Sequence, residues 1–336
     1  MPIKHFTIQD AATLYGVKEW GNGYFGIHSK GHLEVYPTQD ENLCADIYEI
    51  VQALRKKGIR TPLNLRFPQI LQDRVETLNE AFRKAIREYE YGGSYQGVFP
   101  VKTNQTKEVV EEIVRVGQKY RYGLEAGSKP ELMIALNMAL HPEALVLCNG
   151  YKDEAFIRMA LLARKAGRNV LITVEKMTEL PLILKVAKEL KVEPLLGLRA
   201  KLASMGAGKW EDSAGDQAKF GLTTREILEA VEVMEKRGML ESIIELHFHI
   251  GSQITDIRKV KAAMKEATRI YAKLVKMGVP LKYLNVGGGL GVDYDGSRTT
   301  FASSMNDTIH EYAEDVVYTT KDICSQEQVP MPDLLS

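Results

Sequence analysis

The feature that most constrains the fold is a regular alternation of short apolar runs with amphipathic stretches, which begins near Ser94. Short apolar runs bounded by turn residues predict buried strands, and the amphipathic stretches between them have the spacing of crossover helices. This rhythm is typical of a parallel sheet covered by helices. The expected strands lie at residues 96–101, 122–126, 144–148, 170–174, 195–199, 243–250 and 283–286, with an eighth near 333–335.

Eight βα units in roughly 250 residues match the size of a (β/α)8 TIM barrel. A doubly wound open sheet is the alternative, which periodicity does not distinguish. The chain before Ser94 follows other patterns, because polar and apolar residues alternate over 24–36 and predict a β hairpin. Helical spacing follows over 42–57 and again from about 69 to 89.

Composition and charge exclude several classes of protein. The 44 basic residues balance the 44 acidic ones, so no overall field would attract nucleic acid or a membrane surface. Cys44, Cys148 and Cys324 are odd in number and far apart, which favours reduced thiols over a disulfide framework or a zinc site. No apolar stretch of about 18 residues occurs, and no secretory apolar region follows Met1. We therefore expect a cytoplasmic protein that acts on a small molecule.

The ends of the expected strands carry an unusual set of side chains. Barrel active sites are assembled at the C-terminal ends of the strands, where a purely structural account expects ordinary loop residues. The expected strand ends favour an active site instead, because they carry one lysine, an arginine, a histidine, two carboxylates and two glycine-containing turns. These strand ends read Lys102-Thr103-Asn104, Glu125-Ala126-Gly127-Ser128, Asn149-Gly150, Glu175, Arg199, His249-Ile250-Gly251-Ser252 and Gly287-Gly288-Gly289-Leu290-Gly291.

The glycine run 287–291 follows an apolar strand, and successive glycines let backbone N–H groups approach a phosphate closely. Its spacing and its late position do not fit the dinucleotide fingerprint, whereas phosphate in barrels is often bound after the last two strands. A tight turn without a ligand is the ordinary alternative. Ser252 could add a hydroxyl and a helix N-terminal amide to the same phosphate, although an isolated serine is more often an N-cap.

Two histidines and one lysine have both a functional and an ordinary interpretation. His247 and His249 are two apart on a strand and share a face, so they could bind a metal, but no third ligand is evident. His249 could instead stack on an aromatic cofactor ring, or be a satisfied polar residue at the barrel mouth. Lys102 ends an apolar strand, where partial burial would favour the neutral amine that an aldehyde cofactor requires, whereas most lysines are solvated surface charges.

Three segments together resemble the biosynthetic arginine decarboxylases: residues 98–105 (VFPVKTNQ), 247–253 (HFHIGSQ) and 286–294 (VGGGLGVDY). That family belongs to the alanine-racemase-like, fold-type III pyridoxal-phosphate enzymes, which have a barrel and a β domain, and the resemblance extends over nearly the whole chain. Two further stretches favour arginine decarboxylases over their ornithine and diaminopimelate relatives. They are residues 64–71, and residues 198–202 together with the long segment that connects them to 219–222.

The resemblance implies a domain organisation. Residues 1–40 would be the N-terminal β segment of the β domain, and residues 41–336 would form the barrel that binds pyridoxal phosphate, ending at its last strand. The rest of the β domain would lie beyond residue 336, together with an acidic residue for the pyridine nitrogen and an arginine for the phosphate. The sequence is therefore expected to be an N-terminal portion of a longer enzyme, with impaired activity by itself.

The resemblance also implies roles at the strand ends. Lys102 would hold pyridoxal phosphate covalently, His249 would stack on its ring, and both are the expected catalytic residues. Glu125 and Arg199 would lie near the ring and its lysine. The expected phosphate ligands are Ser252, Gly287, Gly288 and Gly289. The expected substrate-binding residues are Leu284, Asn285, Val286, Gly287, Gly288, Gly289, Leu290, Gly291, Val292, Asp293 and Tyr294.

By the same resemblance, the full-length protein would convert L-arginine to agmatine and carbon dioxide in polyamine biosynthesis. It would use Mg²⁺ as well, at ligands that the sequence does not identify, and would form a homo-oligomer, either a dimer or a tetramer. One alternative is a decarboxylase of ornithine, diaminopimelate or carboxynorspermidine. An alternative of another class is a non-catalytic barrel that binds pyridoxal phosphate, or a fragment that only associates with other chains.

Overall fold

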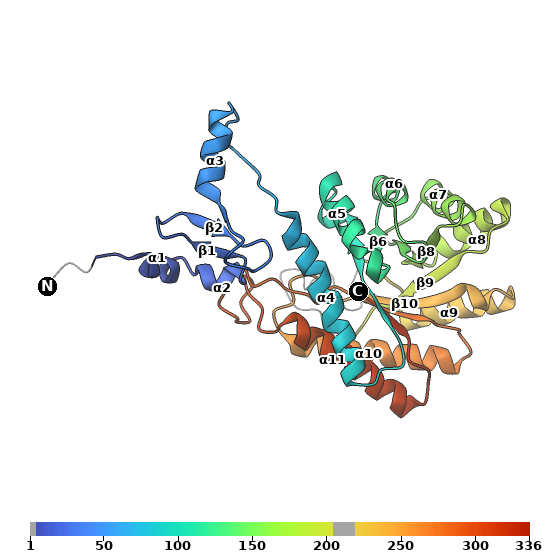
Figure 1. The fold of residues 1–336 in the computed structure, drawn as a ribbon. Coiled ribbons are helices and arrows are strands. Elements are labelled where there is room, and N and C mark those ends of the chain that lie inside the picture. Colours follow the sequence, from blue (N-terminus) through green and yellow to red (C-terminus); the bar gives the residue numbers. More distant parts are fainter. Residues whose placement is uncertain (1–4, 204–218) are drawn as a thin grey trace.

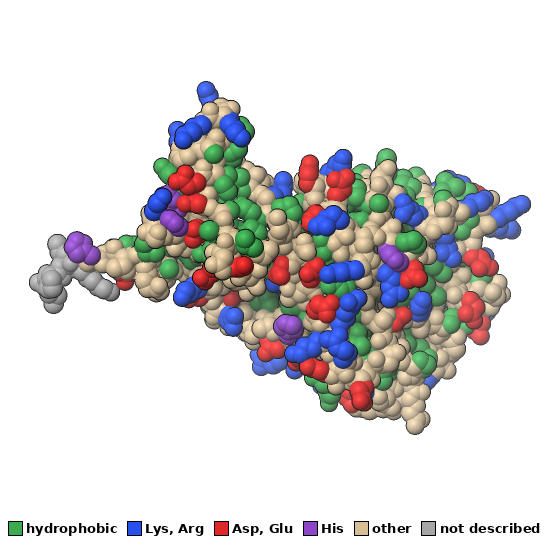
Figure 2. Space-filling view, in the orientation of Figure 1, with side chains coloured by type: hydrophobic (Ala, Val, Ile, Leu, Met, Phe, Trp, Pro, Cys, Tyr) green, Lys and Arg blue, Asp and Glu red, His purple; other side chains and the backbone are tan. Residues whose placement is uncertain are grey.

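The structure is a computed structural model that describes residues 5–203 and 219–336. Residues 1–4 and 204–218 lie outside the described residues. The second range contains most of the segment between 198–202 and 219–222 that supported the family resemblance. Among the helices that are described, none combines the length and the apolar composition that a membrane span requires. Figure 2 shows acidic and basic side chains interspersed over the visible face, in keeping with the balanced charge.

A closed parallel barrel forms the larger part of the molecule (Figure 1). The strand order is β4-β12-β11-β10-β9-β8-β7-β6-β5. Only Gly97 separates β4 from β5, so the sheet starts and ends on one chain segment and closes on itself. The strands are β4 (Tyr95–Gln96), β5 (Val98–Pro100), β6 (Gly123–Ala126), β7 (Leu145–Cys148), β8 (Asn169–Val174), β9 (Leu195–Arg199), β10 (Ile243–His249), β11 (Tyr283–Gly287) and β12 (Asp333–Leu335).

The barrel prediction is therefore confirmed, and the open sheet is excluded. β12, the strand expected near 333–335, pairs in parallel with β11 on one side and with β4 on the other. The first expected strand, 96–101, is wrong in detail because it is split at Gly97 and gives way to a 3-10 turn, Val101–Thr103. A Cβ atom at Gly97 would lie 2.0 Å from Tyr122 Cε2, so only glycine fits there.

Helices surround the barrel and bury one apolar face each against the strands (Figure 1). Most of them begin at a side chain that caps the first turn, such as Ser128, Asp153, Thr223 and Thr308. Most of the buried apolar residues of the strands and helices form one large cluster, and the others form two smaller clusters. The helices are α4 (Pro68–Glu88), α5 (Lys107–Gly117), α6 (Lys129–Asn137), α7 (Glu154–Lys165), α8 (Glu179–Leu190), α9 (Thr224–Lys236), α10 (Ile257–Lys276) and α11 (Ile309–Glu327).

A small N-terminal unit lies to one side of the barrel (Figure 1). The predicted hairpin is confirmed, since β1 pairs antiparallel with β2, and β2 then pairs with β3. The helix expected over 42–57 starts later, because Asp46 ends β3 and caps α3. Two short helices, α1 and α2, were not predicted. The unit consists of α1 (Ile8–Leu14), α2 (Val17–Gly21), β1 (Phe25–Ile27), β2 (Leu33–Val35), β3 (Ala45–Asp46) and α3 (Ile47–Lys56).

The barrel interior contains a buried carboxyl group. Glu245 of β10 accepts hydrogen bonds from the Thr173 hydroxyl (3.0 Å) and from the Asn285 amide (2.7 Å). A Cβ atom at Gly197 on the neighbouring strand would lie 1.8 Å from Glu245 Oε2, so glycine makes the room for this carboxyl. Burial raises the pKa of Glu245 to about 7. The native barrel therefore favours the protonated acid.

This burial predicts a pH-dependent stability. Because the native pKa of Glu245 lies above its ordinary value of 4.5, the native state holds a proton that the unfolded chain releases. The free energy of unfolding should then fall as pH rises from about 4.5 to 7, by roughly 3 kcal/mol from this group. Glu245→Gln should remove that part of the slope, and the exposed Glu241→Gln should retain it. Urea unfolding across this pH range measures the slopes, and equal slopes for both variants would contradict the assignment.

Candidate active site

The expected side chains do meet at the C-terminal ends of the barrel strands, which we call the barrel mouth and define by Lys102, Glu125, Glu175, Arg199 and His249. They come from the segments that follow or end β5, β6, β8, β9 and β10. Parallel strands in a closed barrel present all their C-terminal ends on one rim. The barrel thus brings Lys102 and His249, which are 147 positions apart in the sequence, to the same rim.

Lys102 lies on the 3-10 turn that follows β5, and its amine points toward the neighbouring strand. Its Nζ atom lies 3.3 Å from Glu125 Oε1, and Glu125 is itself 18% exposed. The expected burial of Lys102 is wrong, because 54% of its side chain is exposed. A carboxylate partner, and not desolvation, therefore positions this amine.

Arg199 is held by a carboxylate that is completely buried. Glu175 Oε1 accepts a hydrogen bond from Arg199 Nη1 at 3.1 Å and another from the Gly150 backbone N–H at 2.8 Å. The Glu175 side chain has no exposed surface, whereas Arg199 is 16% exposed. This geometry fixes the guanidinium at the rim. The sequence placed Glu175 among the strand ends but assigned it no role.

A second buried pair supports the Glu175 segment, and sequence reasoning missed it. Lys152 Nζ donates to the carbonyl groups of Gly150 and Thr173, both at 2.5 Å, and lies 3.5 Å from Glu179 Oε2. Glu179 Oε2 also accepts the Glu175 backbone N–H at 2.8 Å. The one sequence feature that could have indicated Lys152 and Glu179 as site residues is their position, because each closely follows the end of a strand. Buried charges so fully paired give the rim a defined shape.

His249 presents a neutral ring at the C-terminal end of β10. Although its ring remains accessible, protein surrounds it closely, and this desolvation together with the cations of Arg199 and Lys102 lowers its pKa to about 3. Its Nδ1 atom accepts the Gly251 backbone N–H at 3.0 Å. His249 is therefore uncharged at neutral pH and fixed in one tautomer, with an accessible aromatic face.

His247 is used differently, which argues against the possible two-histidine metal pair. It is buried, and its Nδ1 atom lies 3.2 Å from the Asn285 carbonyl oxygen. Burial is the main cause that holds its pKa well below the ordinary value. Within residues 5–203 and 219–336, His247 and His249 belong to no group of three metal-ligating residues.

The glycine run lies side by side with the segment that follows β10. Gly289 N donates to Gly251 O at 3.2 Å, and a Cβ atom at Gly288 would lie 2.1 Å from that same oxygen. Gly288 and Gly289 have φ angles of +73° and +87°, a region that favours glycine. A Cβ atom at Gly287 would lie 2.9 Å from the His249 ring. The run therefore allows two backbones and the imidazole to approach one another closely.

Ser252 is exposed beside Gly251, but it does not cap a helix. α10 begins at Ile257 and is capped by Asp256, so the expectation of an N-cap or a helical amide at Ser252 is wrong. The intervening residues form an irregular segment in which Gln253 bonds both the N–H and the C=O of Val292. Ser252 thus offers a hydroxyl group without a helix terminus.

The segment 284–294, expected to border the substrate, divides into three parts. The side chains of Leu284 and Val286 are enclosed in the apolar core, so they pack and are not accessible. Asn285 bonds the buried Glu245. Gly289 is buried and the rest of the glycine run is half-buried, whereas Val292 is 50% and Tyr294 is 67% exposed. The backbone is therefore only partly accessible along the glycine run.

The donor set at the barrel mouth fits a phosphorylated aromatic aldehyde such as pyridoxal phosphate. Lys102 supplies an accessible amine, His249 supplies a neutral ring face, and Ser252 with the glycine run supplies a hydroxyl and closely approaching backbone for a phosphate. Four buried side-chain atoms of the described residues have no hydrogen-bond partner, and two of them, Asn149 Oδ1 and Glu175 Oε2, follow barrel strands at their C-terminal ends. Such atoms call for a donor from a ligand or water.

This fold and this set of side chains define the class. Residues 75–331 match the family described as pyridoxal-dependent decarboxylase, pyridoxal binding domain, and the chain belongs to that family. Among curated relatives, the chain is 54% identical to the biosynthetic arginine decarboxylase of Deinococcus radiodurans, over 98% of this chain and 50% of that protein. It is 51% identical to that of Thermosynechococcus vestitus, over 99% and 52% respectively.

Solved structures agree with this assignment. The crystal structure of the biosynthetic arginine decarboxylase from Campylobacter jejuni has a TM-score of 0.84 and 39% identity, and the match covers 96% of this chain and 51% of that one. Diaminopimelate decarboxylase from Helicobacter pylori, with a TM-score of 0.63, 21% identity and coverage of 79% and 60%, shares the fold. The chain spans about half the length of the curated relatives it matches.

The contact between the two backbones can be tested by adding one methyl group. Gly288→Ala places a Cβ atom against the Gly251 carbonyl, whereas Gly167→Ala, at a φ angle of +90°, meets nothing within 4 Å. The control should lose about 1 kcal/mol of unfolding free energy from left-handed backbone strain alone. Gly288→Ala should lose roughly 2 kcal/mol more, because backbone must shift. Urea unfolding measures both losses, and equal values would argue against the close approach.

Proposed function

We propose that this chain is the cofactor-binding barrel of a pyridoxal-phosphate-dependent arginine decarboxylase, which converts L-arginine to agmatine and carbon dioxide. The observation that carries the proposal is the convergence of Lys102, His249 and the glycine run at one barrel mouth. The choice of arginine is supported by the two arginine decarboxylases named above, which are 54% and 51% identical to this chain over nearly its whole length.

In this proposal, the residues at the barrel mouth hold the cofactor. Lys102 Nζ is its covalent attachment point, and the neutral His249 ring lies against the cofactor ring. Ser252, Gly287, Gly288 and Gly289 bind the phosphate through a hydroxyl and backbone N–H groups, and the Gly289 N–H is released from the Gly251 carbonyl to do so. Bound there, pyridoxal phosphate supplies the electron sink that allows an amino acid to lose its carboxylate.

The chain's own residues then position reactants and protons. Glu125 Oε1 lies 3.3 Å from Lys102 Nζ, so its carboxylate orients the amine at the barrel mouth. Glu175 prevents the Arg199 guanidinium from turning away, so that a fixed cation faces the mouth. The low pKa of His249 avoids a second cation beside it. This arrangement favours an ionised substrate carboxylate near Arg199.

The finer parts of the proposal concern assembly and metal. Residues 1–40 are assigned to a β domain and residues 41–336 to the barrel, in keeping with the antiparallel pairing of β1 and β2. The enzyme is proposed to form a homo-oligomer, a dimer or a tetramer, and to require Mg²⁺. These three points rest on the family resemblance, and Mg²⁺ has no assigned ligands.

A lysine substitution tests the attachment point. After incubation with pyridoxal phosphate and reduction with borohydride, the unmutated chain should retain cofactor covalently, and Lys102→Ala should retain none. Lys107→Ala is the matched control, because Lys107 is an exposed lysine of α5 paired only with Glu111. Mass spectrometry of the intact chains gives the readout. Retention by Lys102→Ala equal to that of the control would overturn the assignment.

A substrate comparison tests the activity separately. In an assay of the full-length protein, agmatine should accumulate from L-arginine faster than decarboxylated products accumulate from ornithine, diaminopimelate or carboxynorspermidine. Faster turnover of another of these would support the related decarboxylases instead. Cofactor retention at Lys102 without turnover of any of them would support a barrel that binds the cofactor without catalysis.

A further inference from the structure

Three metal-ligating side chains share one face of the N-terminal sheet. β1 and β2 pair Ile27 with Leu33, so the next residues, His28 and His32, face each other across the turn. The turn is tight, since the His28 N–H donates to the His32 carbonyl at 2.7 Å. β2 then pairs with β3 at Glu34 and Asp46. Because His32 and Glu34 are two apart on one strand, Asp46 lies on the same face as both histidines.

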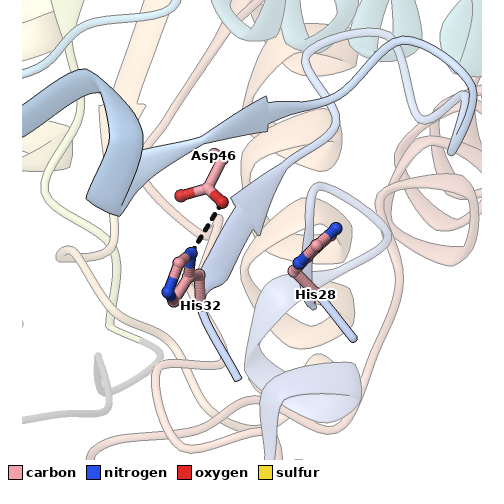
Figure 3. Close-up of side chains that lie close together, drawn as sticks. All are labelled: His28, His32 and Asp46. Carbon is pink, nitrogen blue, oxygen red and sulfur yellow. Dashed lines mark hydrogen bonds and ion pairs between the residues drawn. The ribbon is translucent and has the colours of Figure 1, made fainter. Parts of the chain in front are cut away.

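The ligand atoms of these three side chains lie within 4.8 Å of one another (Figure 3). Figure 3 shows His32 joined to Asp46 by a hydrogen bond, with His28 beside them. All three are partly buried: the side chains of His32 and Asp46 are 22% and 18% exposed. Within the described residues, no other group of histidine, cysteine, aspartate or glutamate meets the same geometric condition.

The contacts of His32 and Asp46 prepare both for a cation. Asp46 Oδ2 lies 2.8 Å from His32 Nδ1, so a cation that replaces the proton between these two atoms meets both of them as ligands. Asp46 Oδ1 accepts the Glu49 backbone N–H at 3.0 Å and caps α3. Partial desolvation raises the pKa of Asp46, but the hydrogen bonds from Glu49 and His32 outweigh it and lower the pKa below its ordinary value. The carboxylate is therefore ionised at neutral pH.

The N-terminal unit has little apolar core of its own. Val17, Tyr24 and Val35 are its buried hydrophobic residues, within the part of it that the structure describes. Several other large apolar side chains of the unit are exposed, and these are Phe6, Ile8, Leu14, Tyr15, Leu33, Leu43 and Tyr48. Small units that bury so little surface are commonly stabilised by a metal or another cross-link. A cation here would tie the β1–β2 turn to the start of α3.

We propose that His28, His32 and Asp46 bind a divalent cation of the zinc class, with water at the remaining position. Two imidazoles and one carboxylate suit Zn²⁺, Co²⁺ or Ni²⁺, whereas Mg²⁺ prefers oxygen ligands alone. This site is therefore distinct from the magnesium requirement proposed above. Zinc–nitrogen bonds of about 2.0–2.1 Å place tetrahedral ligands roughly 3.3 Å apart. The His32–Asp46 pair, now 2.8 Å apart, has to open slightly, and His28 has to move toward it. His28 Nδ1 now accepts the Lys30 N–H at 3.1 Å, so His28 binds the cation either through Nε2 or after releasing that contact.

Zinc titration of the whole chain against a chromophoric competitor tests the site. The unmutated chain should bind one equivalent, and His28→Gln and His32→Ala should each weaken the affinity by at least about 10-fold. His310→Ala is the matched control, because His310 is exposed on α11. Mg²⁺ in excess should not compete. The visible spectrum of bound Co²⁺ should show tetrahedral coordination, which His28→Gln should lose.

Two further readouts separate loss of a ligand from loss of folding. Zinc should slow hydrogen–deuterium exchange across residues 25–50 in the unmutated chain and leave it unchanged in His28→Gln, whose circular dichroism should match that of the unmutated chain. Zinc affinity that is equal in the unmutated chain, His28→Gln and His32→Ala would overturn the proposal. So would affinity that is lost only in His249→Ala, because the cation would then bind at the barrel mouth.

Discussion

Closure of the barrel by β12 is the constraint on which the rest of the structure depends. The last strand lies between β11 and β4, and its backbone joins the two ends of the sheet. Leu334 N donates to Ser94 O, and Val98 N donates to Ser336 O, both at 2.8 Å. An open sheet would spread its strand ends along a line, whereas a closed one arranges them in a ring. Lys102 and His249 can serve one ligand only because of this ring.

The barrel mouth then depends on buried charges that are held in pairs. Glu175 and Lys152 have no exposed side-chain surface, and each is tied to backbone as well as to an opposite charge. Removing charges from water is costly, so such groups persist only where the surrounding hydrogen bonds are nearly complete. This rigidity gives Arg199 a fixed direction. Lys102, in contrast, is half-exposed and positioned by one contact, which leaves its amine free to react.

The N-terminal unit and the barrel are stabilised by different interactions. The barrel buries a continuous apolar cluster between its strands and helices, so its stability comes mainly from packing. The unit has three short strands and leaves many large apolar side chains exposed. Its tie to the barrel includes a hydrogen bond from the Tyr24 hydroxyl to Asp73 of α4. Polar contacts such as the His32–Asp46 pair therefore carry a larger share of its order.

The sequence by itself determined the strand and helix order of the barrel and most of its strand limits, because apolar periodicity and turn residues are local signals. It also identified which strand ends carry reactive groups. Sequence alone did not determine the exposure of Lys102, the role of Glu175 or the absence of a helix cap at Ser252. Those depend on neighbours from other strands, such as Glu125 and Arg199, and on where α10 begins. The local sequence pattern specifies on which face of a strand or helix a side chain lies. Only the tertiary packing determines which residues that side chain contacts.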